Sequence, residues 1–214
     1  MENPEITHTV SKGVSILAGR LEVIRGCMFS GKTEELLRRV KRLEYANQKY
    51  LAFKLKIDKR YSESDIVSHN GISIPAISVN HPEEIVRHIY KNKEKADVVA
   101  IDEAQFFLTH EIVNCVEFLV GEGYRVIVAG LDTDYRGDVF GFVGDLLAVC
   151  DEDIHLKAVC AVCGGEADRT QLLVNNKPAK ESEPVILVGG NDDFGPHGKK
   201  YKYQARCRSC HKIG

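Results

Sequence analysis

The amino-acid sequence predicts an α/β fold, a doubly wound and mainly parallel sheet followed by a small C-terminal domain. Apolar runs of strand length alternate with stretches of helical periodicity, which is typical of such a sheet. Two C-x-x-C pairs near the end of the chain predict the second domain. We therefore expect a flexible N-terminal arm over residues 1–18, an α/β domain over 19–150 and a cysteine-containing domain over 151–214.

The first strand and the first helix enclose a glycine-rich turn. The apolar run Leu21–Ile24 predicts the strand, and apolar residues at helical spacing predict a helix over Lys32–Tyr45. Between them, Gly26–Thr33 has the spacing G-x-x-x-x-G-K-[ST]. This pattern is the phosphate-binding P-loop, so we expect this domain to bind a nucleoside triphosphate.

The chemistry of a P-loop assigns a task to its main positions here. Gly26 and Gly31 allow backbone N–H groups to turn toward anionic oxygens, and the positive end of the following helix adds to their field. Lys32 can reach the terminal phosphates, and the Thr33 hydroxyl can coordinate Mg²⁺. The loop alone does not identify the group that receives the phosphate.

The second predicted strand, Tyr50–Leu55, leads into a polar segment that contains Asp58 and Arg60. Ligands of open α/β sheets bind at the carboxyl ends of strands, although position alone favours solvated charges here. Further on, a proline interrupts the short apolar stretch Ile72–Ile77, which predicts an edge strand or a loop. Pro82 then predicts the first position of a helix.

A continuous apolar strand, Ala96–Ile101, runs directly into Asp102 and Glu103. Apolar runs of this kind form the middle of parallel sheets. In a chain that has a P-loop, an acidic residue at the end of such a strand is expected to complete the Mg²⁺ site, which assigns Asp102 to the metal. Glu103 beside it is then available to act as a base on the attacking group.

Three further elements continue the alternation of helices and strands. They are a helix over His110–Glu122, a core strand over Arg125–Leu131 and a helix over Phe140–Val149. This alternation supports the mainly parallel sheet.

The two cysteine pairs, Cys160 with Cys163 and Cys207 with Cys210, predict a tetrahedral structural zinc site. Four thiolates satisfy the metal and leave no open position for chemistry. His211 is an alternative fourth ligand in place of Cys210. A redox role for the C-x-x-C pairs is disfavoured because two copies occur in one small region.

Between the pairs lies a long segment that zinc would hold at its base. We expect a strand over Ile154–Ala158 ahead of the first pair and another over Val185–Val188 inside the segment. Residues 191–202 are polar and contain glycine, which predicts a mobile loop.

The composition limits the possible partners and the compartment. Lys and Arg number 29 and Asp and Glu 31, so the net charge of −2 gives no basic field to attract nucleic acid or a membrane surface. No apolar run approaches the roughly 20 residues that span a bilayer, and the first 19 residues do not resemble a secretory signal. Seven cysteines, an odd number, favour a reducing cytoplasm over disulfides.

Taken together, these segments resemble the zinc-containing, cytosolic type of thymidine kinase. The resemblance is carried by Gly26–Thr33, Asp58–Tyr61, Asp102–Phe107, Leu131–Gly137, Phe140–Gly141, the two cysteine pairs, Thr170 and Gly189–Gly190. A P-loop alone would be unspecific. Its combination with Asp-Glu-x-Gln-Phe-Phe and two cysteine pairs in this order is specific, and it spans nearly the whole chain after Gly19.

The resemblance implies a P-loop, RecA-like domain and a zinc-binding domain whose lasso loop closes over the nucleoside base. It implies transfer of the γ-phosphate of ATP to the 5′-hydroxyl of thymidine or deoxyuridine, with Glu103 as the general base. The implied phosphate-binding residues are Gly26, Ser30, Gly31, Lys32, Thr33 and Arg60, and the implied Mg²⁺ residues are Thr33, Asp58 and Asp102. The implied nucleoside-binding residues are Met28, Phe106, Leu131, Tyr135, Thr170, Leu187, Gly189 and Tyr203.

The resemblance also implies a homotetramer, a structural Zn²⁺, feedback inhibition by dTTP and a place in the salvage of nucleosides for DNA synthesis in the cytoplasm. One departure concerns residues 191–202, which look like an insertion ahead of Tyr203. Tyr203 is assigned because it lies four residues before Cys207, and Tyr201 is the alternative.

Two other classes of function compete with this reading. Asp102–Gln105 also resembles the acidic motif of helicases, which would make the chain a zinc-ribbon ATPase that acts on nucleic acid. The absence of room for a second motor domain and the slightly negative charge disfavour this alternative. A non-catalytic nucleotide sensor with structural zinc is a weaker third, and Glu103 argues against it.

Overall fold

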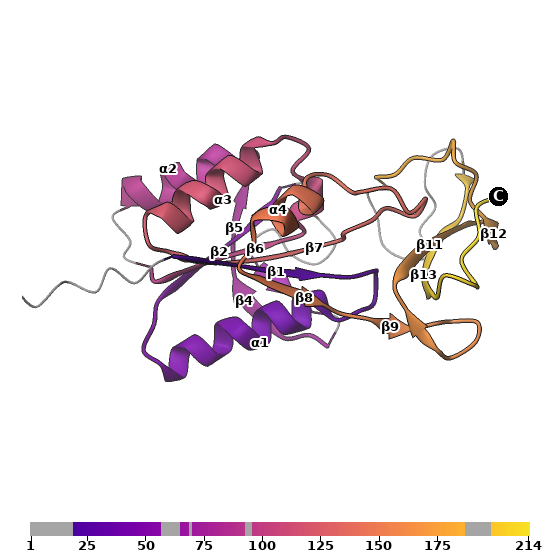
Figure 1. The fold of residues 1–214 in the computed structure, drawn as a ribbon, viewed down its shortest axis with the longest axis horizontal. Coiled ribbons are helices and arrows are strands. Elements are labelled where there is room, and N and C mark those ends of the chain that lie inside the picture. Colours follow the sequence, from indigo (N-terminus) through magenta and orange to yellow (C-terminus); the bar gives the residue numbers. More distant parts are fainter. Residues whose placement is uncertain (1–18, 57–64, 69, 93–95, 187–197) are drawn as a thin grey trace, which may run out of the picture.

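The computed structural model describes residues 19–56, 65–68, 70–92, 96–186 and 198–214. Its larger part is a six-stranded sheet in the order β5-β2-β6-β7-β1-β8, in which every neighbouring pair is parallel (Figure 1). The strands are β1 (Arg20–Arg25), β2 (Tyr50–Leu55), β5 (Ile77–Val79), β6 (Val98–Asp102), β7 (Arg125–Gly130) and β8 (Glu152–His155). The predicted α/β fold with a parallel sheet is confirmed.

Helices cover both faces of this sheet. The helices are α1 (Lys32–Tyr45), α2 (Pro82–Asn92), α3 (Glu111–Gly121) and α4 (Val143–Val149), and a short 3₁₀ helix, η1, spans Ala104–Phe106. In Figure 1, α1 lies below the sheet, and α2 and α3 lie above it. Residues of α3 and α4 share one core cluster and residues of α1 belong to the other, so the sheet is doubly wound as expected.

Burial on both faces explains why the central strands read as unbroken apolar runs. In β7, Val126 and Val128 pack on the side of α3, and Ile127 and Ala129 pack on the side of α1. Because both faces of a central strand are buried, neither can be polar, and the strand's sequence does not alternate between apolar and polar residues. The apolar runs therefore locate the central strands well.

Two elements differ from the expectation in ways that have local causes. The apolar stretch Ile72–Ile77 is divided between β4 (Ser73–Pro75), which pairs antiparallel with β3 (Asp65–Val67), and β5, the edge strand of the main sheet. The predicted helix from Phe140 begins at Val143 instead. Gly141 has a φ of 56° and precedes the helix, so the chain is still turning at that point.

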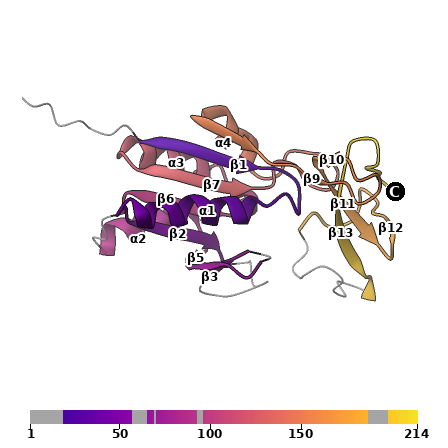
Figure 2. The ribbon, with the colours of Figure 1, turned by 90° about the horizontal axis from the view of Figure 1, so that it is seen from below.

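The C-terminal part is built from small antiparallel sheets and lies at one end of the main sheet (Figures 1 and 2). Its strands are β9 (Ala158–Val159), β10 (Glu166–Ala167), β11 (Arg169–Val174), β12 (Lys177–Pro178) and β13 (Tyr201–Arg206). β9 pairs with β10, and β11 lies between β12 and β13.

Three predictions about this part need correction or fall outside the described residues. The strand expected over Ile154–Ala158 is two strands, β8 and β9, and β8 pairs with β1 as the edge of the main sheet. In the strand expected over Val185–Val188, residues 185 and 186 are irregular, and the others lie outside the described residues. Within the expected mobile loop 191–202, residues 201 and 202 already belong to β13.

Among the residues that the structure describes, no helix has both the length and the apolar character that crossing a membrane requires.

Candidate functional site

The P-loop, Gly26–Thr33, joins β1 to α1, and its glycines are required by its geometry. Gly26 has a φ of 147°, and a Cβ there would lie 2.2 Å from the carbonyl oxygen of Leu156. Gly31 has a φ of 85° and forms the N-cap of α1. Both positions exclude ordinary side chains, because such φ values strain them and Gly26 has no room for a Cβ.

Inside this loop, two polar groups fit an anionic ligand. Ser30 Oγ is the one buried side-chain oxygen in the described ranges that lacks a hydrogen-bond partner. Lys32 Nζ donates to the carbonyl oxygen of Cys27 at 2.9 Å, which holds the ammonium group across the loop. The first N–H groups of a helix have no partner within it, so the start of α1 adds further donors. These groups suit the phosphates of a nucleotide.

Thr33 and Asp102 bring the P-loop together with the end of β6. Thr33 Oγ1 donates to Asp102 Oδ2 at 3.2 Å. Burial, together with the charge of Glu103, raises the pKa of Asp102 to about 7. A divalent cation would favour the carboxylate instead. A hydroxyl and a carboxylate are oxygen ligands of the kind that Mg²⁺ prefers, so the two residues fit the predicted metal role.

Glu103 follows Asp102 in a strained conformation. Its φ of 52° and ψ of 42° lie in the left-handed region, which is uncommon for a residue with a side chain. The Glu103 backbone N–H donates to Asp102 Oδ1 at 2.9 Å, so the aspartate helps to hold this turn. Burial lowers the pKa of Lys32, and the negative charge of Glu103 is the strongest opposing influence. The predicted base and the predicted phosphate-binding lysine therefore share one electrostatic environment.

Two polar residues that sequence reasoning missed organise this end of the sheet. The buried side-chain amide of Gln105 bonds both to the Glu103 carboxylate and to the Leu131 N–H that follows β7. The Arg25 guanidinium, at the end of β1, bonds to Asp132 and to Asp153 at 2.9 and 2.8 Å. The position of Gln105, two residues after the predicted base, is visible in the sequence. Its second partner, the Leu131 N–H, follows a different strand, so the sequence did not reveal the contact.

The P-loop also contacts the C-terminal part. The Met28 N–H donates to Thr170 Oγ1 at 3.0 Å, and Thr170 is buried in β11. The Cys27 thiol donates to the carbonyl oxygen of Ala167 at 3.4 Å, and Cys27 is fully buried among Cys160, Ala167 and Ala205. Met28 and Thr170, both predicted to bind the nucleoside, thus meet where the loop and β11 touch.

The other predicted nucleoside residues fall into three groups. Phe106 packs edge-on against Phe140, with ring centroids 5.9 Å apart. Tyr135, from the loop after β7, and Tyr203, from β13, belong to a separate cluster, and the Tyr135 hydroxyl bonds to the backbone carbonyls of Lys180, Glu181 and Glu183 in the C-terminal part. Leu187 and Gly189 lie outside the described residues, as do Asp58, predicted for Mg²⁺, and Arg60, predicted for phosphate.

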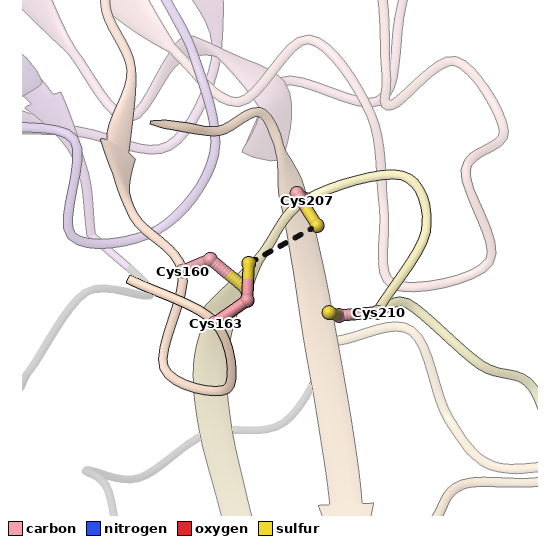
Figure 3. Close-up of side chains that lie close together, drawn as sticks. All are labelled: Cys160, Cys163, Cys207 and Cys210. Atoms are coloured by element: carbon pink, nitrogen blue, oxygen red, sulfur yellow. Dashed lines mark hydrogen bonds between the residues drawn. The ribbon is translucent and has the colours of Figure 1, made fainter. Parts of the chain in front are cut away.

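The four predicted zinc cysteines form one cluster (Figure 3). The sulfur atoms of Cys160, Cys163, Cys207 and Cys210 all lie within 4.8 Å of one another, and Cys163 Sγ is 3.7 Å from Cys207 Sγ. A tetrahedral site with Zn–S bonds of about 2.3 Å has sulfur–sulfur edges of roughly 3.8 Å. The cluster can therefore hold a structural metal, and its geometry and soft ligands are consistent with zinc.

The surroundings of these cysteines support the same assignment. Hydrogen bonds from backbone N–H groups, first that of Cys163 and then that of Cys207, lower the pKa of Cys160 to about 6, which favours the thiolate that a metal requires. His211, the alternative fourth ligand, bonds through Nε2 to the carbonyl oxygen of Tyr135 at 2.8 Å. It lies outside the cluster, so the structure favours Cys210.

The fold and the site define a P-loop α/β protein with a C-terminal cluster of four cysteines that can hold a metal. Thr33 of the P-loop contacts Asp102 at the end of β6, and Glu103 follows Asp102 in the chain. The four clustered cysteines include Cys160, which packs against Cys27 of the loop. The family model described as thymidine kinase matches residues 19–211, and the chain therefore belongs to the thymidine kinase family. Membership of this family makes it a kinase, an enzyme that transfers a phosphoryl group.

Proposed function

We propose that this kinase transfers the γ-phosphate of ATP to the 5′-hydroxyl of thymidine, or of deoxyuridine, to give the nucleoside monophosphate. The observation that carries the proposal is the family match over residues 19–211, together with Glu103 beside the contact between Thr33 and Asp102. A phosphate cradle needs a neighbouring base only if an acceptor must be deprotonated.

In the proposed reaction, Glu103 accepts the proton of the 5′-hydroxyl as its oxygen bonds to the γ-phosphorus and the bond from that phosphorus to ADP breaks. Lys32, Ser30 and the amides of the loop, including Gly26 and Gly31, hold the phosphates of ATP, and Arg60 assists them. Mg²⁺ bound by Thr33, Asp102 and Asp58 would neutralise phosphate charge during transfer. Burial around Asp102 strengthens these interactions, since the local dielectric is low.

The acceptor side is proposed to be formed by the nucleoside residues implied by the family. They are Met28, Phe106, Leu131, Tyr135, Thr170, Leu187, Gly189 and Tyr203. The contact between Met28 and Thr170 supports this assignment, because it brings the C-terminal part directly to the P-loop. Enclosure of the base by both parts would exclude water, which otherwise competes as the acceptor.

Family membership also supports four broader proposals. The four cysteines hold a structural Zn²⁺ that has no part in the chemistry. The enzyme works in the cytoplasm in nucleoside salvage, assembles as a homotetramer and is inhibited by dTTP. Neither nucleic acid nor a membrane is proposed as a partner.

The direct test is a panel of nucleosides incubated with ATP and Mg²⁺ and scored for monophosphate. We expect product from thymidine and deoxyuridine. Product only from cytidine or adenosine, or no product, would remove the central proposal. ATP hydrolysis stimulated by DNA without any monophosphate would favour the alternative of an ATPase that acts on nucleic acid.

The role of Glu103 is tested by Glu103→Gln, which keeps the size of the side chain but removes its basicity. We expect kcat for thymidine to fall by at least about 10²-fold, the usual contribution of general-base catalysis, while ATP still binds. Glu117→Gln, the same chemical change at an exposed position in α3, is the matched control and should retain wild-type kcat. Full activity of Glu103→Gln would exclude the base role.

A further inference from the structure

We propose that Gln105 is a positioning residue for the phosphotransfer, which fixes the carboxylate of Glu103 relative to the strand end that carries Leu131. This inference rests on the proposed function, because it assumes that Glu103 is the base. It extends that function by assigning a task to a residue that does not itself touch the substrate.

The first argument is the burial of Gln105 and the use of its side chain. Gln105 is 0% exposed, lies in η1 and follows the proposed base by two residues. Its Nε2 donates to Glu103 Oε2, and its Oε1 accepts the Leu131 N–H at 2.9 Å. A buried amide normally satisfies both of its ends, and here the two partners come from the ends of neighbouring strands, β6 and β7.

The second argument is that the direction of this amide is determined. A backbone N–H can only donate, so the Leu131 N–H requires an oxygen of Gln105 opposite it. The nitrogen of the amide must then face Glu103, and it can only donate to Oε2. Gln105 thus fixes the orientation of the Glu103 carboxylate as well as its position.

The third argument is that neighbouring glycines leave space for this arrangement. A Cβ at Gly130 would lie 3.1 Å from Gln105 Oε1. A Cβ at Gly141 would lie 2.4 Å from the backbone carbonyl oxygen of Gln105, and the φ of Gly141 is 56°. The close packing of β7 and the following turn against η1 therefore fixes the backbone and the amide of Gln105. Glu103, whose own backbone is strained, gains a rigid partner.

The consequence for the reaction is a selective loss of rate. Misplacement of a catalytic group by about 1 Å can cost about 10²-fold. Gln105→Met keeps an unbranched side chain of similar length but removes both hydrogen bonds. We expect kcat for thymidine to fall about 10²-fold, with the KM for thymidine changed less than about threefold and ATP affinity unchanged, since no substrate contact is removed.

Gln171→Met is the matched control. Gln171 is 1% exposed, and its amide likewise bonds to backbone groups of two residues, Leu172 and Lys212, within the C-terminal part. Its substitution removes a buried amide of the same kind whose hydrogen bonds go to Leu172 and Lys212 instead of Glu103. If Gln105 only supported the fold, both variants would lose kcat and thermal stability to the same degree, and that result would overturn the proposal.

A double-mutant cycle tests whether Gln105 acts through Glu103. We expect Gln105→Met to cost about 10²-fold in the wild-type background but less than about twofold in a Glu103→Gln background, where the residual rate is followed with radiolabelled product. An equal loss in both backgrounds would show that Gln105 acts on something else. Wild-type kcat in Gln105→Met alone would also overturn the proposal.

A spectroscopic measurement tests the hydrogen bond between Gln105 and Glu103 even if Gln105→Met fails to fold. The side-chain ¹⁵NH₂ resonances of Gln105 in the full-length protein should shift on Glu103→Gln, because a hydrogen bond to a carboxylate becomes one to an amide. Unshifted resonances would exclude the contact. If the wild-type enzyme phosphorylates no nucleoside, the proposed function fails, whereas this measurement still reports on the positioning contact.

Discussion

The six-stranded sheet and the C-terminal part are held together in different ways. On its two faces the sheet buries one cluster of twenty apolar residues and another of twelve among the described residues. The C-terminal part contributes three residues to each of two clusters of four; Cys27 or Tyr135 from the larger part completes each cluster, and Cys160 in the first is one of the four cysteines that can hold a metal. Burial of a large apolar side chain contributes about 1.5–3 kcal/mol, so the sheet has a large apolar source of stability.

This difference separates the two sides of the proposed active site. The residues proposed for phosphate and Mg²⁺, namely Lys32, Thr33 and Asp102, stand on elements of the large core. Thr170, Tyr135 and Tyr203 stand on, or pack against, strands whose core is small. Substitutions that unfold the C-terminal part should therefore leave ATP binding largely intact. Substitutions that unfold the sheet should instead abolish the binding of both ATP and the nucleoside.

The largest expected effect follows from removal of the metal. Cys207→Ser should lose the metal and with it thymidine phosphorylation, because zinc contributes about 10–16 kcal/mol to the folding of small zinc domains. ATP affinity should stay within about tenfold of wild type, which is about 1.4 kcal/mol. Metal content, monophosphate formation and calorimetric ATP binding measure the three quantities. Cys150→Ser, outside the cluster, is the control and should retain all three.

A paired leucine substitution tests the two cores with the metal in place. Leu36 in α1 and Leu172 in β11 are both 0% exposed. Leu36→Ala should lower the free energy of unfolding by about 2–5 kcal/mol, because a large core relaxes only partly around a cavity. Leu172→Ala should cost less, since its four-residue cluster can collapse more completely. Chemical denaturation followed by circular dichroism compares them, and equal losses would contradict the distinction.

The smallest effect concerns the reactivity of cysteines in the metal-free protein. Burial raises the pKa of Cys115, in the large core, to about 12, whereas backbone N–H groups lower that of Cys160 to about 6. Because the thiolate is the reactive form, about one in 10⁵ Cys115 side chains is reactive at pH 7, whereas Cys160 has a far larger thiolate fraction whether its backbone N–H groups hold it or metal loss releases it into solvent. Alkylation of Cys160 should precede that of Cys115, and the reactivity of Cys115 should rise about tenfold with each pH unit toward its pKa. Mass spectrometry measures the order, and the reverse order would contradict the two environments.

The large sheet was predictable because its signals are local. The bounds of α1 and β2 agree with those read from apolar periodicity, and Pro82 begins α2 as expected. The cysteine cluster was predictable from spacing, since two C-x-x-C pairs limit how four sulfurs can be arranged.

The missed features depend on partners far away in the sequence. β8 has alternating exposure and no apolar run, and only its pairing with β1 makes it part of the main sheet. The role of Gln105 depends on the Leu131 N–H, 26 residues further along the chain. The strands β10 and β12 have two residues each and β13 is half exposed, so their pattern resembles that of a loop. Pairing, more than propensity, determines these elements.

The burial of Cys27 between the P-loop and the C-terminal part limits how the chain can be divided. A fragment that ended near residue 150 would lack β8, which would leave β1 as a bare sheet edge. It would also uncover Cys27 and deprive the Met28 N–H of Thr170. The nucleotide-binding loop would then lose one of its walls. A fragment meant to keep the ATP affinity expected of the full chain therefore has to extend past β8 and supply a cover for Cys27, so the α/β part cannot be cut at residue 150 for engineering or transplanted onto another acceptor domain.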